Sequence, residues 1–290
     1  MLRVLVGAAV LAASTGCALA PSALHGPPPA DTRRFTAHVA LHGASLELHL
    51  AVPAAPVSDT VVLYATGDGG WFGTAVDMFY AVAAHGYRTV GFSARAFLRI
   101  ERPPHAPLSP RQLADDYATI LTAARAALGV PPATPAILTG WSRGAAFAAI
   151  AATQPVLRAG TRGVVAIGLA ADEDLAIGDD DDDGDGDDGP GDNGPGDHGP
   201  GDHGPEGSPS PQPRPFRPYA HLHQLAPLRC AVIQADHDDY LPAAQAAALL
   251  GPDTPTRRLY AVAARNHRFA DGRGAFVAAL TSALRWVDQA

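Results

Sequence analysis

The segment Gly140-Trp141-Ser142-Arg143-Gly144 places small residues two positions before and two positions after a serine. Where such a segment joins a strand to a helix, this spacing allows a turn tight enough to expose the serine hydroxyl. The start of the helix also favours developing negative charge. The pattern by itself is common by chance, so Ser142 is a candidate nucleophile for acyl transfer whose support must come from the rest of the chain.

A serine hydroxyl is a poor nucleophile without a neighbouring base. In proteins that use this five-residue segment for catalysis, an acid and then a histidine follow the serine along the chain. His267 is the candidate base, because it comes just after the apolar run Leu259–Val262 and no histidine follows it. The other histidines, His237 among them, have no matching spacing, and we interpret them as surface or structural residues.

Three aspartates in one loop, Asp236, Asp238 and Asp239, follow another apolar run and could orient His267. In many proteins with this order of residues, the acid stands three residues before a Val-Pro or Leu-Pro pair that opens the next helix. Counting back from Leu241-Pro242 selects Asp238. Asp236 and then Asp239 are the alternatives, and either of them is otherwise a solvated turn residue.

Acyl transfer also needs N–H donors that face the oxyanion, commonly one just after the nucleophile and one from a glycine-rich loop after an early strand. Arg143 supplies the first donor. The loop Thr66-Gly67-Asp68-Gly69-Gly70-Trp71 fits the second, since glycine lets the backbone approach a ligand closely. We expect that donor from Gly69, Gly70 or Trp71; the alternative interpretation of the loop is a simple tight turn.

The elements that must position these residues alternate along the chain. Residues 35–41 and 46–50 alternate apolar with polar or small residues, which predicts an antiparallel hairpin around His42-Gly43-Ala44. Short apolar runs then predict strands buried on both faces. They are residues 61–65, 89–92, 136–139, 164–167, 231–233 and 259–262.

Between most of these runs lie stretches in which Ala, Leu and Arg recur at helical spacing, and we predict helices there. They cover residues 75–84, 110–128, 145–152, 242–250 and 274–287. A hairpin followed by repeated strand-helix units predicts a mostly parallel sheet with helices on both faces. Such a sheet carries its chemistry at the carboxyl ends of the strands. Together with the serine segment, this predicts an α/β-hydrolase fold.

The first residues have the pattern of an export signal, with Arg3 before the apolar stretch Val4–Ala13. Ser14-Thr15-Gly16-Cys17 resembles the lipobox of bacterial lipoproteins, in which the cysteine becomes the lipidated first residue. The alternative is cleavage after Ala18-Leu19-Ala20, which Pro21 disfavours. We therefore expect a periplasmic lipoprotein attached to a membrane through Cys17.

Twelve acidic and no basic residues lie between Asp179 and Glu206, mixed with glycine and proline. This composition predicts disorder, and without this segment the remaining chain carries a net positive charge. The spacing of acids and histidines matches no calcium loop, so we predict no metal site. The predicted organisation is a signal over 1–17, a tether over 18–32, one α/β-hydrolase domain in two parts over 33–177 and 216–290, and a disordered insert over 178–215.

Gly67-Asp68-Gly69-Gly70-Trp71 resembles the VirJ/AcvB family of bacterial periplasmic virulence-associated proteins. Residues 90–98 are similar to that family's second-strand segment and residues 110–116 to its following helix, so that the similarity extends over about 61–170. This chain departs from the family in the residues that flank the serine, Trp141 and Arg143, and in its acidic insert. The resemblance implies a periplasmic α/β-hydrolase that, in some members, hydrolyses the aminoacyl ester of lysyl-phosphatidylglycerol; other members are tied to type IV secretion.

The sequence thus favours a membrane-tethered serine esterase that uses Ser142, His267 and Asp238 through an acyl-enzyme. Its expected partners are an ester or aminoacyl-lipid substrate and the membrane, with no cofactor, no nucleic acid and a monomeric state. A positively charged body suits an anionic bilayer. The alternative function is a non-catalytic binding or chaperone module on a hydrolase scaffold linked to virulence or secretion. Peptidase and acyltransferase chemistry would use the same three residues.

Overall fold

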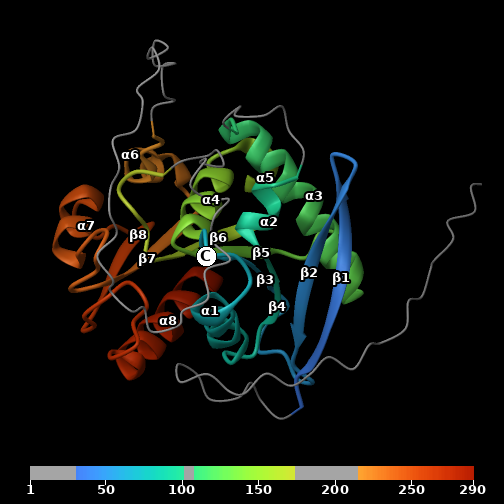
Figure 1. Ribbon diagram of the computed structural model, residues 1–290, viewed down its shortest axis with the longest axis horizontal. Coiled ribbons are helices and arrows are strands. Elements are labelled where there is room, and N and C mark those ends of the chain that lie inside the picture. Colours follow the sequence, from blue (N-terminus) through green and yellow to red (C-terminus); the bar gives the residue numbers. More distant parts are fainter. Residues whose placement is uncertain (1–30, 101–107, 174–214) are drawn as a thin grey trace, which may run out of the picture.

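A mixed sheet runs through the centre of the protein, and its eight strands within the described residues follow the order β1-β2-β4-β3-β5-β6-β7-β8 (Figure 1). The computed structural model describes residues 31–100, 108–173 and 215–290. The predicted signal and Cys17, nearly all of the predicted tether and all but the last residue of the predicted insert lie outside the described residues.

The strands after the hairpin are all parallel to one another, and β2 joins them by antiparallel pairing with β4. The strands are β1 (Arg33–Leu41), β2 (Ala44–Val52), β3 (Val61–Ala65), β4 (Arg88–Phe92), β5 (Ala136–Trp141), β6 (Thr161–Ile167), β7 (Arg229–Ala235) and β8 (Arg257–Val262). Each of the predicted strands is present, and several extend by one to three residues beyond the apolar run that predicted them.

The helices are α1 (Gly73–Ala83), α2 (Ala94–Leu98), α3 (Pro110–Leu128), α4 (Arg143–Ala152), α5 (Pro155–Arg158), α6 (Pro218–His221), α7 (Ala243–Leu250) and α8 (Arg273–Asp288), with a 3-10 turn at Leu222–Leu225. The predicted bounds of α3 agree with the structure because its ends carry local signals. Ser109 and Gln112 form a capping box, Pro110 occupies the first turn and Gly129 ends the helix in the left-handed region.

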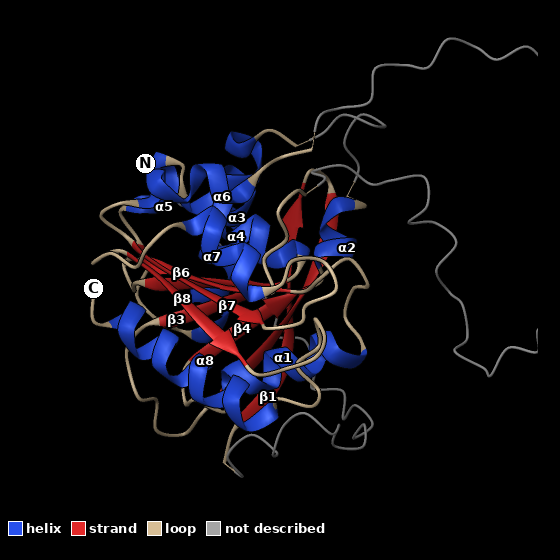
Figure 2. Cartoon of the chain, turned by 90° about the vertical axis from the view of Figure 1, so that its left-hand side faces the viewer, coloured by secondary structure: helices blue, strands red, loops and turns tan. Residues whose placement is uncertain are grey.

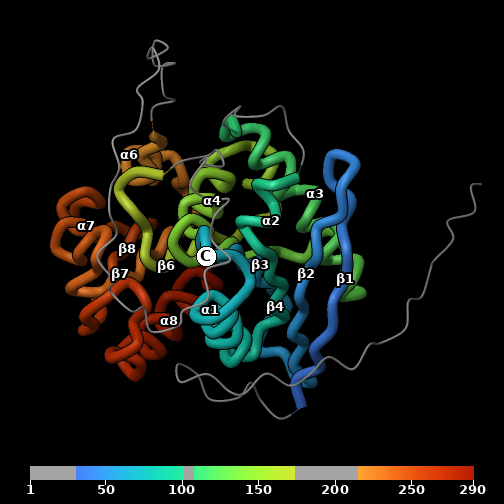
Figure 3. Tube along the Cα trace, in the orientation of Figure 1, coloured from blue at the N-terminus to red at the C-terminus, as the bar shows by residue number. Residues whose placement is uncertain are grey.

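The β1–β2 hairpin stands at one edge of the sheet, opposite β7 and β8 (Figure 3). His42 and Gly43 form its two-residue turn, and both have positive φ, which suits the twist of a tight hairpin. Nε2 of His42 lies 2.7 Å from Oδ1 of the buried Asp116, so the turn is fixed to α3.

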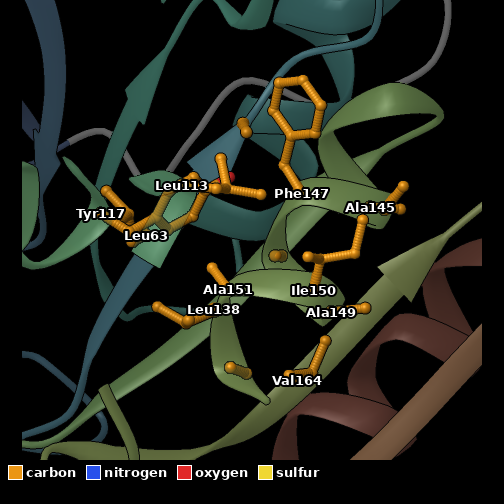
Figure 4. Packing of buried hydrophobic residues seen from close by; sticks show 14 of the residues in the cluster. Leu63, Leu113, Tyr117, Leu138, Ala145, Phe147, Ala149, Ile150, Ala151 and Val164 are labelled. Atoms are coloured by element: carbon orange, nitrogen blue, oxygen red, sulfur yellow. The ribbon is translucent and has the colours of Figure 1, made fainter. Parts of the chain in front are cut away.

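Helices cover both faces of the sheet, with α1 and α8 on one side and α3, α4, α6 and α7 on the other (Figure 2). Alternate residues of β3 face the two layers: Leu63 packs with α3 and α4, whereas Tyr64 packs with α1 and α8. Figure 4 shows the first layer, where α4 residues such as Phe147 and Ile150 lie against the sheet. The fold is the predicted one, a mostly parallel sheet of α/β-hydrolase type covered on both faces.

Three short helices, α2, α5 and α6, were not predicted, because four or five residues are too few for a periodic pattern. The segment 90–98, expected to resemble a strand segment, leaves the sheet at Phe92 and turns into α2, whose first turn is capped by Ser93. Within the described ranges, no helix has both the length and the apolar composition required to cross a bilayer.

Candidate active site

Ser142 lies at the turn between the end of β5 and the start of α4, with φ 56° and ψ −123°. Its backbone N–H donates to the carbonyl of Ile167 at 2.9 Å, which fixes the turn to the end of the neighbouring strand β6. A non-glycine residue in this conformation stores strain on the order of 1–3 kcal/mol, which the surrounding structure must hold. The side chain is only partly buried, so the hydroxyl stands at the carboxyl edge of the sheet.

The two glycines of the serine segment are required by backbone contact. A Cβ on Gly140 would lie 2.3 Å from the backbone carbon of Gly144, and a Cβ on Gly144 would lie 2.2 Å from the carbonyl oxygen of Ala65. Both distances are below any real Cβ contact and both neighbours are backbone, which cannot move aside cheaply. The tight turn and the close packing of α4 on β3 therefore need glycine at both positions.

Asp238 and His267 meet at this edge, with Oδ2 of Asp238 2.8 Å from Nδ1 of His267. Both residues are almost fully buried. Asp236 and Asp239, the two alternative acids, are exposed in the same loop. Of the three aspartates, the structure thus brings Asp238 to the histidine. A proton on Nδ1 facing the carboxylate leaves Nε2 as the acceptor nitrogen of the neutral ring.

The buried carboxylate of Asp238 has further donors. The backbone N–H groups of Tyr240 and Leu241 donate to Oδ1 at 2.9 Å and 3.3 Å. The side-chain amide of Gln234 donates to Oδ2 at 3.1 Å and also to the carbonyl of Leu241. These bonds compensate for the loss of water around the buried carboxylate. Gln234 therefore belongs to the site, although the sequence offered no signal for it beyond its place in an otherwise apolar strand.

The ring of His267 is enclosed on several sides. A Cβ on Gly168, which has φ +59°, would lie 2.6 Å from Cε1 of His267. Tyr240 packs edge-on to the ring with centroids 4.8 Å apart, and Trp141 lies 5.3 Å away on the side of the nucleophile. Among the described residues, Nε2 of His267 has no hydrogen-bond partner, Ser142 included. Such bonds are commonly long in ligand-free sites and tighten when substrate binds.

The glycine-rich loop lies against the nucleophile at its first glycine. A Cβ on Gly67 would lie 3.2 Å from Cβ of Ser142. The loop is also a tight turn, since the N–H of Gly70 donates to the carbonyl of Gly67 at 3.2 Å and the N–H of Gly69 donates to the side chain of Asp68 at 3.0 Å. Two of the three expected donors, Gly69 and Gly70, thus already have partners inside the loop.

Trp71, the third expected donor, fixes the far end of the loop through its side chain. Its indole stacks on His49 of β2, with centroids 3.8 Å apart and planes 6° from parallel, and meets the edge of Phe79. A Cβ on Gly91 would lie 2.6 Å from the indole, so the absence of a side chain on β4 makes room for it. Burial lowers the pKa of His49, with smaller opposing and supporting effects of Glu47 and His38.

Arg143, the expected donor after the nucleophile, begins α4 and points its side chain to Glu173. The Nε–Oε1 distance is 2.9 Å, and both side chains are mostly buried. Glu173 in turn exchanges two backbone hydrogen bonds of 2.8 Å with Phe216, on the other side of residues 174–214. Over the ranges that the structure describes, no group of three or more His, Cys, Asp or Glu side chains could hold a metal ion.

Residues 59–190 match the model of the bacterial virulence protein (VirJ) family, which confirms the resemblance found in the sequence motifs. No protein with a curated description matches the chain. Solved structures share the fold at low sequence identity. An α/β serine hydrolase homologue from Coxiella burnetii has a TM-score of 0.53 at 15% identity, covering 86% of this chain and 96% of that one.

Two enzymes with described activities have the same architecture. Naproxen esterase (carboxylesterase NP) from Bacillus subtilis has a TM-score of 0.55 at 12% identity and covers 85% of this chain and 89% of its own. Dienelactone hydrolase from Anabaena variabilis has a TM-score of 0.52 at 16% identity, with coverages of 89% and 98%. At these identities the likeness shows the α/β-hydrolase fold, on which hydrolases and esterases are built.

Proposed function

Because residues 59–190 match the VirJ family and the whole described chain has the α/β-hydrolase fold, we propose that this protein is a serine esterase with Ser142 as nucleophile, His267 as base and Asp238 as orienting acid. The observation that carries the proposal is the buried Asp238–His267 pair, 2.8 Å apart, at the same sheet edge as the strained Ser142. A buried acid-histidine pair beside a partly exposed serine is the arrangement that activates a hydroxyl for acyl transfer.

The chemistry proceeds in two halves. Nε2 of His267 takes the hydroxyl proton as Oγ of Ser142 forms a bond to the ester carbonyl carbon; the tetrahedral intermediate collapses, and the alcohol leaves with the proton from His267. Water then attacks the acyl-enzyme, gives a proton to His267, and the acid product leaves as the proton returns to Ser142. Asp238 holds the ring orientation and stabilises the imidazolium throughout.

The oxyanion is held in this proposal by the backbone N–H of Arg143 and by that of Asp68. Asp68 follows Gly67, the loop residue that lies against Ser142, and its N–H has no hydrogen-bond partner within the described residues. The sequence predicted the second donor at Gly69, Gly70 or Trp71, and of these three the backbone N–H of Trp71 remains a candidate donor to the oxyanion. Donors built into a rigid turn stabilise the oxyanion without reorganising during the reaction.

We further propose that the enzyme acts in the periplasm as a lipoprotein anchored through Cys17, on an aminoacylated anionic lipid such as lysyl-phosphatidylglycerol. The net positive charge of the chain outside residues 179–206 supports a position at an anionic membrane surface. Mass spectrometry of the mature N-terminus tests the anchor: a diacylated Cys17 supports it, and an unmodified chain that starts at Pro21 contradicts it.

A fluorophosphonate probe tests the catalytic proposal on the purified full chain, because only an activated serine reacts. We expect stoichiometric labelling of wild-type protein and none of Ser142→Ala. The matched control is Ser282→Ala, which removes an exposed hydroxyl on α8 and should label like wild type. Absence of labelling in wild type would favour the non-catalytic binding module. Hydrolysis of aryl esters, amides and lysyl-phosphatidylglycerol vesicles then separates esterase, peptidase and lipid-directed activity.

A further inference from the structure

The residue just before the nucleophile is in contact with the loop that carries the base. Trp141 is the last residue of β5, and its indole Nε1–H donates to the backbone carbonyl of His267 at 3.2 Å. The two rings lie 5.3 Å apart, centroid to centroid, at an angle of 32°. The side chain of the residue before the nucleophile thus binds the backbone of the base, which lies 126 residues after Trp141 in the chain.

The same indole also contacts the glycine-rich loop. A Cβ on Gly67 would lie 3.4 Å from Cε3 and 3.6 Å from Cζ3 of Trp141. The three loops that meet at the site, those of Ser142, His267 and Gly67, therefore share Trp141 as a common neighbour.

The loop of His267 holds local hydrogen bonds, such as that from the N–H of Phe269 to the carbonyl of Asn266, whereas the bond from Trp141 acts on the backbone of His267 itself. The carboxylate of Asp238 fixes Nδ1, and Gly168 limits how far the ring can shift on one side. Neither contact holds the backbone of His267. Phe269, two residues after His267, has φ 56°, so the loop carries backbone strain. A donor on the carbonyl of His267 restrains the backbone that the strain would otherwise move.

We propose that Trp141 is a positioning residue that sets the approach of His267 to Ser142 through its indole N–H. The proposal rests on the proposed function, since it assigns how the base reaches the proposed nucleophile. Misplacing a catalytic group by about 1 Å can cost on the order of 100-fold in rate. Loss of one restraining hydrogen bond is expected to cost less than that, about tenfold in the rate of serine labelling.

The test replaces Trp141 by Phe, which keeps an aromatic ring and removes the N–H. We expect the second-order rate of fluorophosphonate labelling and kcat on an aryl ester to fall about tenfold, with KM changed less than twofold. The matched control is Trp286→Phe, which makes the same chemical change on α8, far from the site, against Arg229 and Arg258. Should Trp141→Phe fold poorly, benzothienylalanine at position 141 removes only the N–H.

A second readout separates positioning from general structural support. In a His267→Ala background, Trp141→Phe should cause no further loss of residual ester hydrolysis, because the group it positions is gone. An equal loss in both backgrounds would overturn the proposal. So would wild-type labelling rates in Trp141→Phe. If instead Ser142→Ala retains labelling, the proposed function itself fails, and that outcome is distinct from either result at Trp141.

Discussion

Nε of Arg143 lies 2.9 Å from Oε1 of Glu173, and both side chains are mostly buried. The pair connects the residue after the nucleophile to Glu173, whose backbone forms an antiparallel bridge with Phe216. A charged pair in this position restrains the first turn of α4, which begins at Arg143 directly after the nucleophile. The structure therefore ties the bridge between Glu173 and Phe216 to the strained turn at Ser142.

Removing one partner of this pair should be costly. We expect Glu173→Gln to lower the free energy of unfolding by about 2–4 kcal/mol, because Arg143 then keeps a buried charge with a weaker partner. Asp172→Asn is the matched control, since it weakens the neighbouring exposed Arg217–Asp172 pair and should cost less than about 1 kcal/mol. Urea unfolding of the two variants measures the difference, and equal small losses would contradict a structural role for the Arg143–Glu173 pair.

Asp238→Asn should reduce kcat by up to about 10⁴-fold, because an amide in that place favours the wrong tautomer of His267. Asp236→Asn and Asp239→Asn alter exposed side chains of the same loop and should stay near wild type. Steady-state hydrolysis of an aryl ester gives the comparison. A larger loss in Asp236→Asn than in Asp238→Asn would reassign the acid.

Gly168→Ala should slow serine labelling strongly, because the new methyl group would meet the ring of His267. Part of any effect comes from placing alanine at positive φ, which costs about 1 kcal/mol or more. Gly129→Ala controls for that part, since Gly129 has φ +67° at the end of α3 but no atom within 4 Å of its missing Cβ. Both variants should lose stability, and only Gly168→Ala should lose labelling.

Acid should destabilise the contact between His49 and Trp71. Burial lowers the pKa of His49, so below about pH 6.5 the unfolded chain binds a proton that the folded chain does not. The contribution of the neutral, buried His49 to the free energy of unfolding is present above that pH. It is lost as pH falls through the pKa of His49 in the folded protein. His49→Phe keeps an aromatic partner for Trp71, and its urea midpoint should fall less than that of wild type between pH 7 and pH 5. Equal falls would assign the acid sensitivity to other groups.

The thiol of Cys230 should resist alkylation in the folded protein. Burial raises its pKa to about 12, with a smaller opposing effect of Arg257, so the reactive thiolate is scarce at pH 8. Since the folded pKa lies above the ordinary value of 9.0, this contribution to stability is present below pH 9 and is lost as pH rises toward 12. Iodoacetamide labelling with and without urea measures the protection, and rapid labelling of native protein would contradict it.

Local signals determined much of the fold. The continuous apolar runs predicted strands buried on both faces, and those of β3 to β7 lie inside the central sheet between two helical layers. The prediction was wrong for the last run, 259–262, because β8 is the edge strand of the sheet and Ala261 is exposed. Helical spacing over 110–128, with Pro110 in the first turn, predicted the bounds of α3, and the structure shows that Ser109 and Gly129 fix its two ends through neighbours in the chain. The three shortest helices, α2, α5 and α6, were not predicted, because four or five residues are too few to show a helical repeat of apolar positions.

For the candidate site too, the sequence indicated the residues that spacing and chain order mark, whereas the structure was needed for the contacts between distant segments. The sequence by itself determined Ser142 with its two glycines, His267 as the last histidine, and a short list of acids, because spacing and chain order are local properties. The structure showed that the N–H groups of Gly69 and Gly70 donate hydrogen bonds inside their own loop. Only the tertiary structure decided that Asp238 reaches His267 and that Gly168 and Trp141 enclose its ring. These are contacts between distant segments, fixed by how strand ends meet at one edge of the sheet.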